Sequence, residues 1–123
     1  MTEYRTIHPQ FNDTFLYYES VPEGIREALW NYFAYGIHPG GFLMHILNNN
    51  FLGAMGSADH TWTGRSFQHL ARWINQYAPR QAYGNAENIK AWQHLTDEER
   101  RDIMIELRLR PSVIDILRGV GVA

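Results

Sequence analysis

The chain has 123 residues, a length that predicts a single domain, and 45% of them are apolar, which is enough for a hydrophobic core and argues against a disordered chain. A net charge of −2 disfavours sequence-independent binding of duplex nucleic acid. The absence of cysteine excludes disulfide bonds, thiolate zinc sites and cysteine nucleophiles.

The N-terminal residues lack the basic flank and apolar run of a signal peptide, and no apolar stretch reaches the roughly 18 residues of a membrane span. We therefore expect a cytoplasmic protein that does not enter a membrane. Aromatic residues are frequent, at 14% of the chain. Because exposed aromatic side chains are enriched at interfaces, some of these rings are expected to contact a partner.

Residues 1–19 show no helical period, and Pro9 interrupts them. Apolar side chains are nevertheless scattered through this segment. We expect an extended arm or a short strand that packs on the body of the protein or on a neighbouring subunit. A frayed terminus is the alternative.

The first helix is predicted to begin at Ser20, because Ser20 and Glu23 have the spacing of a capping box, and to end at Gly36. Its apolar positions recur at steps of three and four residues, as in an amphipathic helix. These positions are Val21, Ile25, Ala28, Leu29, Tyr32 and Phe33.

A second helix is predicted from about Phe42 to Ala58. Its apolar face is expected to comprise Leu43, Ile46, Leu47, Phe51, Ala54, Met55 and Ala58. Small and polar residues occupy the other side, namely His45, Asn48, Asn49, Gly53 and Gly56. Such a side indicates either contact with solvent or a close approach of another helix.

Three further helices are expected. The third follows Thr63 as its N-cap and ends before Pro79, with a buried face of Phe67, Leu70, Ala71, Ile74 and Tyr77. Residues 80–84 are expected to form a loop. Asn85 then caps a short fourth helix, in which Ile89, Trp92 and Leu95 are expected to be apolar contacts.

Thr96 and Glu99 form a second capping box, so a fifth helix is predicted from about Asp97, burying Ile103, Met104 and Leu107. Pro111 interrupts this helix, and a last short turn follows from Ser112. The predicted fold is all-α, a compact bundle of about five or six short helices. It comprises an extended N-terminal arm (residues 1–19) and one helical domain (residues 20–123).

The turn between the first two helices is the strongest candidate for a binding site. Pro39, Gly40 and Gly41 precede a helix start, where unpaired N–H groups attract anions. We expect the N–H groups near Gly40, Gly41 and Phe42 to receive a phosphate or carboxylate. The alternative is a tight helix–helix connection in which the glycines only avoid a clash.

Other chemistry is poorly supported. His38, His45, Asp59 and His60 form the only cluster that resembles a metal set, and their spacing is not that of a zincin. No serine lies in a nucleophile-elbow motif. We therefore predict no metal, no cofactor and no catalytic residue. Trp62, which lies among polar neighbours, is a candidate contact residue, whereas Trp92 is expected in the core.

Part of the chain resembles a group of small bacteriophage and prophage proteins that share a P-G-G-F-L turn. The matching residues, within about 22–95, are Pro22-x-Gly24, Ala28-Leu29-x-x-Tyr32, Gly36-Ile37-x-Pro39-Gly40-Gly41-Phe42-Leu43, Leu47-x-Asn49, Ala58-Asp59, and later Gly84, Glu87 and Trp92. The chain departs from the group at Asn50, where an acidic residue is frequent. The resemblance implies a host-takeover or anti-defence factor that works by binding in the host cytoplasm.

Two functions follow as expectations. In the first, a non-enzymatic homo-oligomer sequesters a phosphate-bearing nucleotide signal, and its ligand-binding residues are His38, Gly40, Gly41, Phe42, His45, Asn48 or Asn49, and Arg65 or Arg72. In the second, the protein inhibits a host protein by binding it directly. A small hydrolase is a more remote third possibility.

Overall fold

The structure, a computed structural model, describes residues 7–16, 18–58 and 64–109. Within these ranges the chain forms α-helices and one 3-10 helix, and it contains no strand, so the all-α prediction is confirmed. The elements are α1 (Pro9–Asp13), α2 (Glu23–Tyr35), α3 (Gly41–Leu47), α4 (Phe51–Ser57), α5 (Gly64–Tyr77), η1 (Arg80–Ala82), α6 (Ala86–His94) and α7 (Asp97–Leu109).

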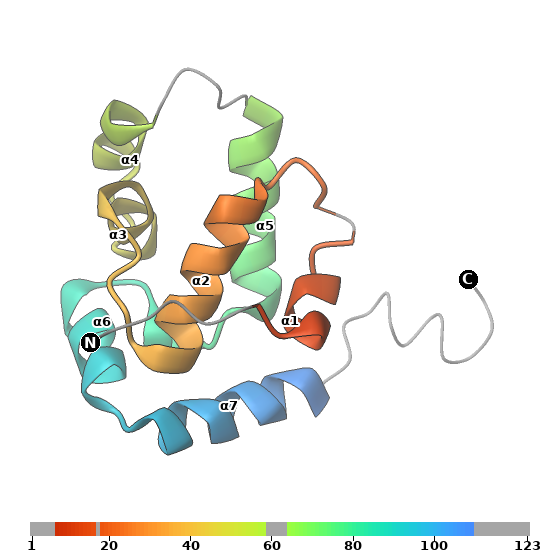
Figure 1. The fold of residues 1–123 in the computed structure, drawn as a ribbon. Helices are drawn as coiled ribbons and strands as arrows, with labels where there is room; N and C mark the ends of the chain where they lie inside the picture. The colour runs from red at the N-terminus through yellow and green to blue at the C-terminus, as the bar shows by residue number, and fades with distance from the viewer. Residues whose placement is uncertain (1–6, 17, 59–63, 110–123) are drawn as a thin grey trace.

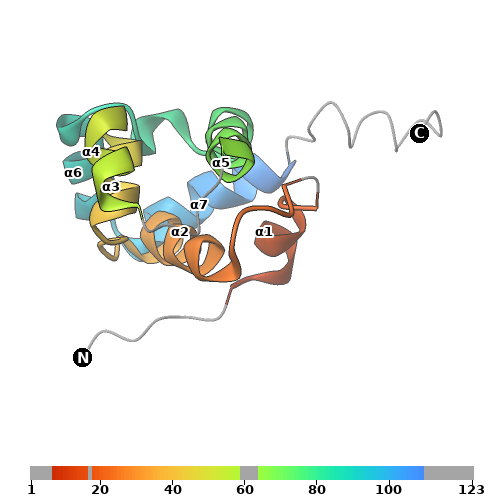
Figure 2. The same cartoon turned by 90° about the horizontal axis from the view of Figure 1, so that it is seen from above.

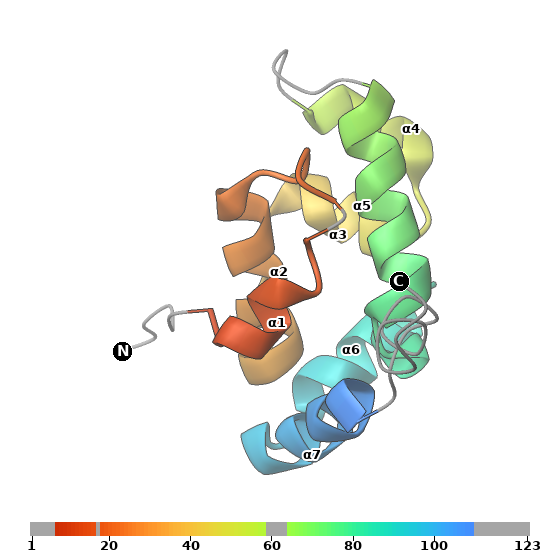
Figure 3. The same cartoon turned by 90° about the vertical axis from the view of Figure 1, so that its right-hand side faces the viewer.

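Helix α2 lies in the middle of the molecule, with α3 and α4 on one side of it and α1 on the other (Figures 1 and 2). Helices α6 and α7 both contact α2. Helix α4 lies at one end of the molecule and α7 at the opposite end (Figures 1 and 3). None of the helices in the described ranges has the length and apolar content needed to cross a membrane.

The core is aromatic. Trp73 of α5 and Trp92 of α6 are fully buried, as is Phe33 of α2, which lies between them with ring centroids 5.9 Å and 6.4 Å away. Tyr32 donates its hydroxyl proton to the Ala82 carbonyl oxygen at 2.7 Å, so its polar end is satisfied inside the protein. Edge and offset ring pairs of this kind add about 1 kcal/mol each beyond the area that they bury.

The N-terminal segment contains a short helix, α1, where an extended arm or strand was expected. Pro9 is the first residue of α1, a position that tolerates proline because the first-turn N–H groups have no intrahelical acceptor. Phe11 and Phe15 are buried, and Phe15 stacks on Trp73 at 4.5 Å. The expectation that this segment packs on the body is therefore confirmed for its described residues.

Helix α2 begins at Glu23 and not at Ser20. The Ser20 hydroxyl lies 2.7 Å from His69 Nδ1, so it is used in a contact with α5 and does not cap α2. The predicted end is confirmed, because Gly36 has φ 68° and its amide donates to the Tyr32 carbonyl oxygen at 2.9 Å. A left-handed residue here is a common way to end a helix.

The single helix predicted from Phe42 to Ala58 is wrong. The chain forms two helices, α3 and α4, separated by Asn48–Asn50. Asn49 has φ 63°, a conformation that asparagine tolerates better than most residues, and the Asn50 side chain caps α4 by accepting from the Gly53 amide at 2.9 Å. As a result, Leu47 and Ala54 are buried, while Phe51 and Met55 are exposed.

The C-terminal half agrees better with the local signals. Asn85 caps α6 by accepting from the Asn88 amide, and Thr96 and Glu99 form the predicted reciprocal box at the start of α7. Residues 80–82 form the 3-10 helix η1, whereas a loop was expected. Ala71 was predicted to be buried and is exposed.

Several predictions fall outside the described part of the chain. They concern the Thr63 cap, Trp62, the interruption at Pro111 and the turn from Ser112. The side chain of Leu107 is likewise outside it.

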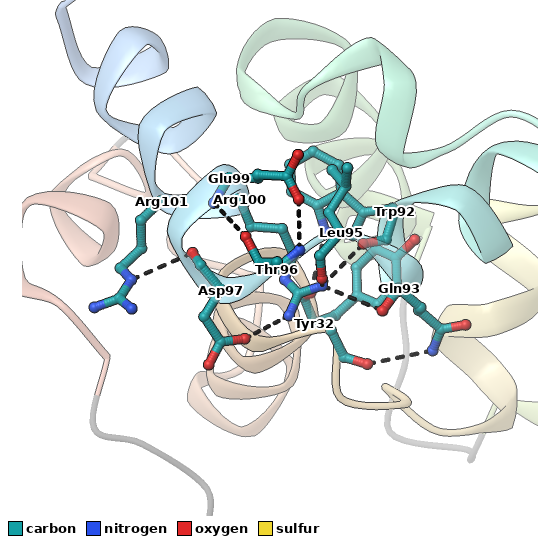
Figure 4. Close-up of polar contacts among 10 residues, drawn as sticks. Tyr32, Trp92, Gln93, Leu95, Thr96, Asp97, Glu99, Arg100 and Arg101 are labelled. Atoms are coloured by element: carbon teal, nitrogen blue, oxygen red, sulfur yellow. Dashed lines mark hydrogen bonds and ion pairs between the residues drawn. The ribbon is translucent and has the colours of Figure 1, made fainter.

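Arg100 joins the C-terminal end of α6 to the start of α7 and is only 4% exposed (Figure 4). Its Nη1 donates to the carbonyl oxygens of Trp92, Gln93 and Leu95, which are acceptors left open where α6 ends, and its Nη2 pairs with Asp97. A Cβ atom added to Gly36 would lie 2.9 Å from Arg100 Cζ, so the glycine also makes room for this guanidinium.

Candidate functional site

The Pro39–Gly41 turn is open to solvent. Gly40 has φ 93° and forms the N-cap of α3, and a Cβ atom added at Gly40 or Gly41 would meet nothing within 4 Å. However, the Gly40 amide already donates to His38 Nδ1 at 3.0 Å. The turn is therefore exposed as expected, but one of its amides is used within the turn.

The polar residues predicted around this turn lie at the far end of α3. The His45 ring is 3.2 Å from the side-chain amide of Asn50, beside the start of α4. Asn48 forms the C-cap of α3, and Asn49 follows it. At about 1.5 Å of rise per residue, Asn48 lies roughly 12 Å along the helix from Gly40. Asn48 and Asn49 are therefore separated from the turn by the length of α3.

By helical spacing, the predicted arginines begin on a different side of α5 from Phe67, which contacts α3. Phe42 is half-buried and contacts Phe67 of α5, with ring centroids 5.7 Å apart. Arg65 is two residues from Phe67, about 200° around the helix, and Arg72 returns to the side of Arg65. Arg72 instead acts on Tyr18: burial raises the pKa of the Tyr18 hydroxyl, and the Arg72 charge opposes that rise.

Two of the three histidines of the predicted metal-like cluster, His38 and His45, lie near opposite ends of α3. Among the described residues, no group of three or more His, Asp or Glu side chains could hold a metal ion. Asp59 and His60 lie outside those residues.

A different surface stands out on α4. Phe51, Leu52 and Met55 are 64%, 83% and 42% exposed, although each carries a large apolar side chain. At 100° per residue, these three residues and the exposed Gly56 occupy one continuous arc of about 140°. We call this arc, formed by Phe51, Leu52, Met55 and Gly56, the α4 face.

The opposite side of α4 is held by the protein. Ala54 is fully buried, and a Cβ atom added to Gly53 would lie 2.6 Å from both the His45 ring and the Asn50 side chain. The α4 face is therefore turned away from α3 because the inner side of the helix is fixed by close contacts. The α4 face is therefore exposed because of the way in which α4 packs on the rest of the protein.

Helix α4 lies in a long stretch of the chain that has no charged residue. Residues 28–58 contain no Asp, Glu, Lys or Arg, although such residues make up 20% of the chain. Charged residues are depleted at the centres of protein interfaces, where aromatic residues and Met are enriched. This gap in charge was the sequence signal that could have identified the surface, but the predicted continuous helix placed Phe51 and Met55 in the core.

A second polar cluster connects the segment before α2 to α5. The Tyr18 hydroxyl donates to the side-chain oxygen of Gln76, and the Tyr18 ring meets the His69 ring edge-on at 5.8 Å. The Val21 amide beside Ser20 donates to the Tyr18 carbonyl oxygen, so the backbone here is also bonded internally. With the Ser20–His69 contact, these bonds position α5 against the beginning of α2 and serve the fold.

Comparisons with models of known protein families, with curated proteins and with solved structures find no match to this chain. Function is therefore inferred from the geometry and chemistry of the chain's own surface.

Proposed function

We propose that this chain is a non-enzymatic binding protein that contacts another protein through the α4 face. The observation that supports the proposal is the exposure of Phe51, Leu52 and Met55 on one arc of a helix whose other side is fixed. Contiguous exposed apolar patches mark interaction sites in soluble proteins.

The chemistry of the face defines the partner surface. Burial of a large apolar side chain contributes about 1.5–3 kcal/mol, so three of them can anchor a complex. An apolar helix of this kind fits a hydrophobic groove, with residues at i, i+1 and i+4 as anchors. Because the face carries no charge, the affinity is expected to change little with ionic strength.

The resemblance to small phage proteins supports a host protein as the partner. Such a partner makes the chain a host-takeover or anti-defence factor that acts in the host cytoplasm by blocking a protein surface. The P-G-G-F-L turn on which the resemblance rests also begins α3, the helix on which α4 is fixed.

Photo-cross-linking from a single position tests this proposal. A benzophenone amino acid replaces Leu52 in the α4 face, and the same amino acid replaces the exposed Asn75 of α5 as the matched control. We expect position 52 to form cross-links to a defined peptide of another protein, and position 75 to form none to that peptide. Equal cross-linking from both positions, or none from position 52, would contradict the proposal.

The alternative, a phosphate-bearing nucleotide held at the Gly40–Gly41 turn, stays a prediction. The open turn is in its favour, whereas the positions of His45, Arg65 and Arg72 are not. Calorimetry with mono-, di- and cyclic nucleotides tests it, with Gly41→Val as the variant, because the added side chain meets no neighbour within 4 Å of its Cβ atom. Binding that the variant loses would support the alternative, and no heat with any nucleotide would end it.

A further inference from the structure

We infer that the α4 face also binds a second copy of this chain, and that two α4 helices pack antiparallel across a two-fold axis. This inference rests on the proposed function in one respect, since both use the α4 face as a contact surface. It adds a partner of known chemistry, the chain itself. The reasons are shape, charge and area.

The shape of the α4 face is self-complementary. Consider an antiparallel pair of α4 helices whose two-fold axis passes through the middle of the α4 face. Each residue then lies near the residue of the second copy for which the two residue numbers add up to about 107. Phe51 then meets Met55 of the second copy, and Leu52 lies over Gly56 of the second copy. A sulfur–aromatic contact is favourable, and a glycine under a leucine lets two helices approach closely.

The absence of charge suits a symmetric contact. In a two-fold interface the same patch meets itself, so any charge near the axis lies close to its own copy and is repelled. Residues 28–58 carry no Asp, Glu, Lys or Arg, and therefore α4 itself brings no charge to the axis that its own copy would repel. A surface built for a basic or an acidic partner would carry complementary charges here.

The area of the face predicts a weak dimer. A standard stable interface buries about 800 Å² on each partner. Three large side chains that are already partly covered supply less than that area, since even a whole aromatic side chain buries only about 150–250 Å². The exposed Asn49, Asn50 and Ser57 add a polar rim. We therefore expect a reversible dimer that forms at micromolar or higher concentration and leaves the face free when the protein is dilute.

A charge-swap experiment tests the symmetric contact. Sedimentation equilibrium is measured over a hundredfold concentration range for the wild type, Leu52→Glu, Leu52→Lys and an equimolar mixture of the two variants. Asn75→Glu on α5 is the control for an added charge at an exposed position. Circular dichroism confirms that each variant is folded, which is expected because Leu52 is 83% exposed.

We expect the wild type and the Asn75→Glu control to rise from the 14.4 kDa of one chain towards twice that mass as the concentration increases. The dissociation constant of the dimer should be at least tenfold higher for each Leu52 variant than for the wild type. The mixture of the two variants should regain most of the wild-type association. A wild type that stays at 14.4 kDa throughout would overturn the inference, as would Leu52 variants that associate as the wild type does or a mixture that shows no recovery.

The two proposals fail in different ways. A monomeric wild type with cross-links from position 52 to another protein would remove the dimer and keep the proposed function. A charge-sensitive dimer whose cross-links from position 52 reach only its own chain would keep the dimer and remove the host partner.

Discussion

At one end of the molecule, α6 and α7 are joined by a buried arginine and two side-chain caps, whereas at the opposite end α4 leaves three large apolar side chains in solvent. The first end is rich in charge, since α7 begins with Asp-Glu-Glu-Arg-Arg-Asp. Helix α4, at the second end, lies in a stretch of the chain that has none. Polar groups are used to fix the α6–α7 end, while the α4 end is fixed on its inner side and open on its outer side. Under the proposed function, stability and binding are thus assigned to different parts of a small fold.

Replacing Arg100 should have the largest effect on stability. Arg100→Ala removes the donor to three carbonyl oxygens at the end of α6 and the partner of Asp97. Because these carbonyl groups then lose their partners, we expect the free energy of unfolding to fall by about 3 kcal/mol. Urea denaturation measures the change. A loss below about 1 kcal/mol would mean that water satisfies the carbonyl oxygens nearly as well as the guanidinium does. The Arg100 hydrogen bonds would then not be what fixes α6 to α7.

Gly36→Ala should have the next largest effect. The residue has φ 68°, and an added Cβ atom would lie 2.9 Å from Arg100 Cζ. We expect a loss of about 2 kcal/mol, from backbone strain and from displacement of the arginine. Gly41→Ala is the matched control, because it lies in α3 with no neighbour within 4 Å of an added Cβ atom, and its stability should be unchanged or higher. Equal losses in both variants would contradict this account.

The caps at the two ends of the molecule should behave differently. Asn50→Ala and Asn85→Ala each remove one side-chain acceptor at a helix start, which costs about 1 kcal/mol. Since α6 carries the buried Trp92, the Asn85 variant should lower global stability. The Asn50 variant should instead speed amide hydrogen exchange within α4 alone. Faster exchange across the whole molecule in Asn50→Ala would show that α4 is part of the cooperative core.

The Glu99 cap should give a small dependence on pH. A hydrogen bond from the Thr96 backbone amide to the Glu99 carboxylate, followed by that of the Thr96 side chain, holds the pKa of Glu99 below its usual value. A carboxylate whose pKa is lowered on folding stabilises the protein above the pKa of the unfolded state, and this contribution is lost as the pH falls through the folded value. Wild type and Glu99→Gln should therefore differ at pH 7 and converge in acid. A difference that grows in acid would contradict the assignment.

The features that the sequence predicted correctly are those set by neighbouring residues. Gly36 ends α2, Asn85 starts α6 and Thr96 with Glu99 starts α7, and each depends on contacts within four residues. The exposure of the Gly40–Gly41 turn also followed from local backbone preference. These signals are independent of the remainder of the fold.

The errors have more than one cause, namely a contact distant in sequence in one case and a local break hidden by the apolar spacing in another. Ser20 does not cap α2 because His69, far along the chain, takes its hydroxyl. The break at Asn48–Asn50 was missed because the apolar spacing continues through it, so Phe51 and Met55 looked like core residues. The role of Arg65 or Arg72 at the Gly-Gly turn stays a prediction, although helical spacing starts both side chains on a different side of α5 from Phe67. Whether side chains from different helices meet in one site depends on how each helix is rotated about its axis in the packed molecule. The spacing of residues in the sequence does not specify that rotation.

The most direct test of the central claim is the free energy of unfolding of Leu52→Glu, measured at low protein concentration. The account predicts a value within about 0.5 kcal/mol of the wild type, because a side chain that is 83% exposed contributes little to the fold. A loss of more than about 1.5 kcal/mol would contradict it, since a loss of that size is typical of a side chain buried by its own chain.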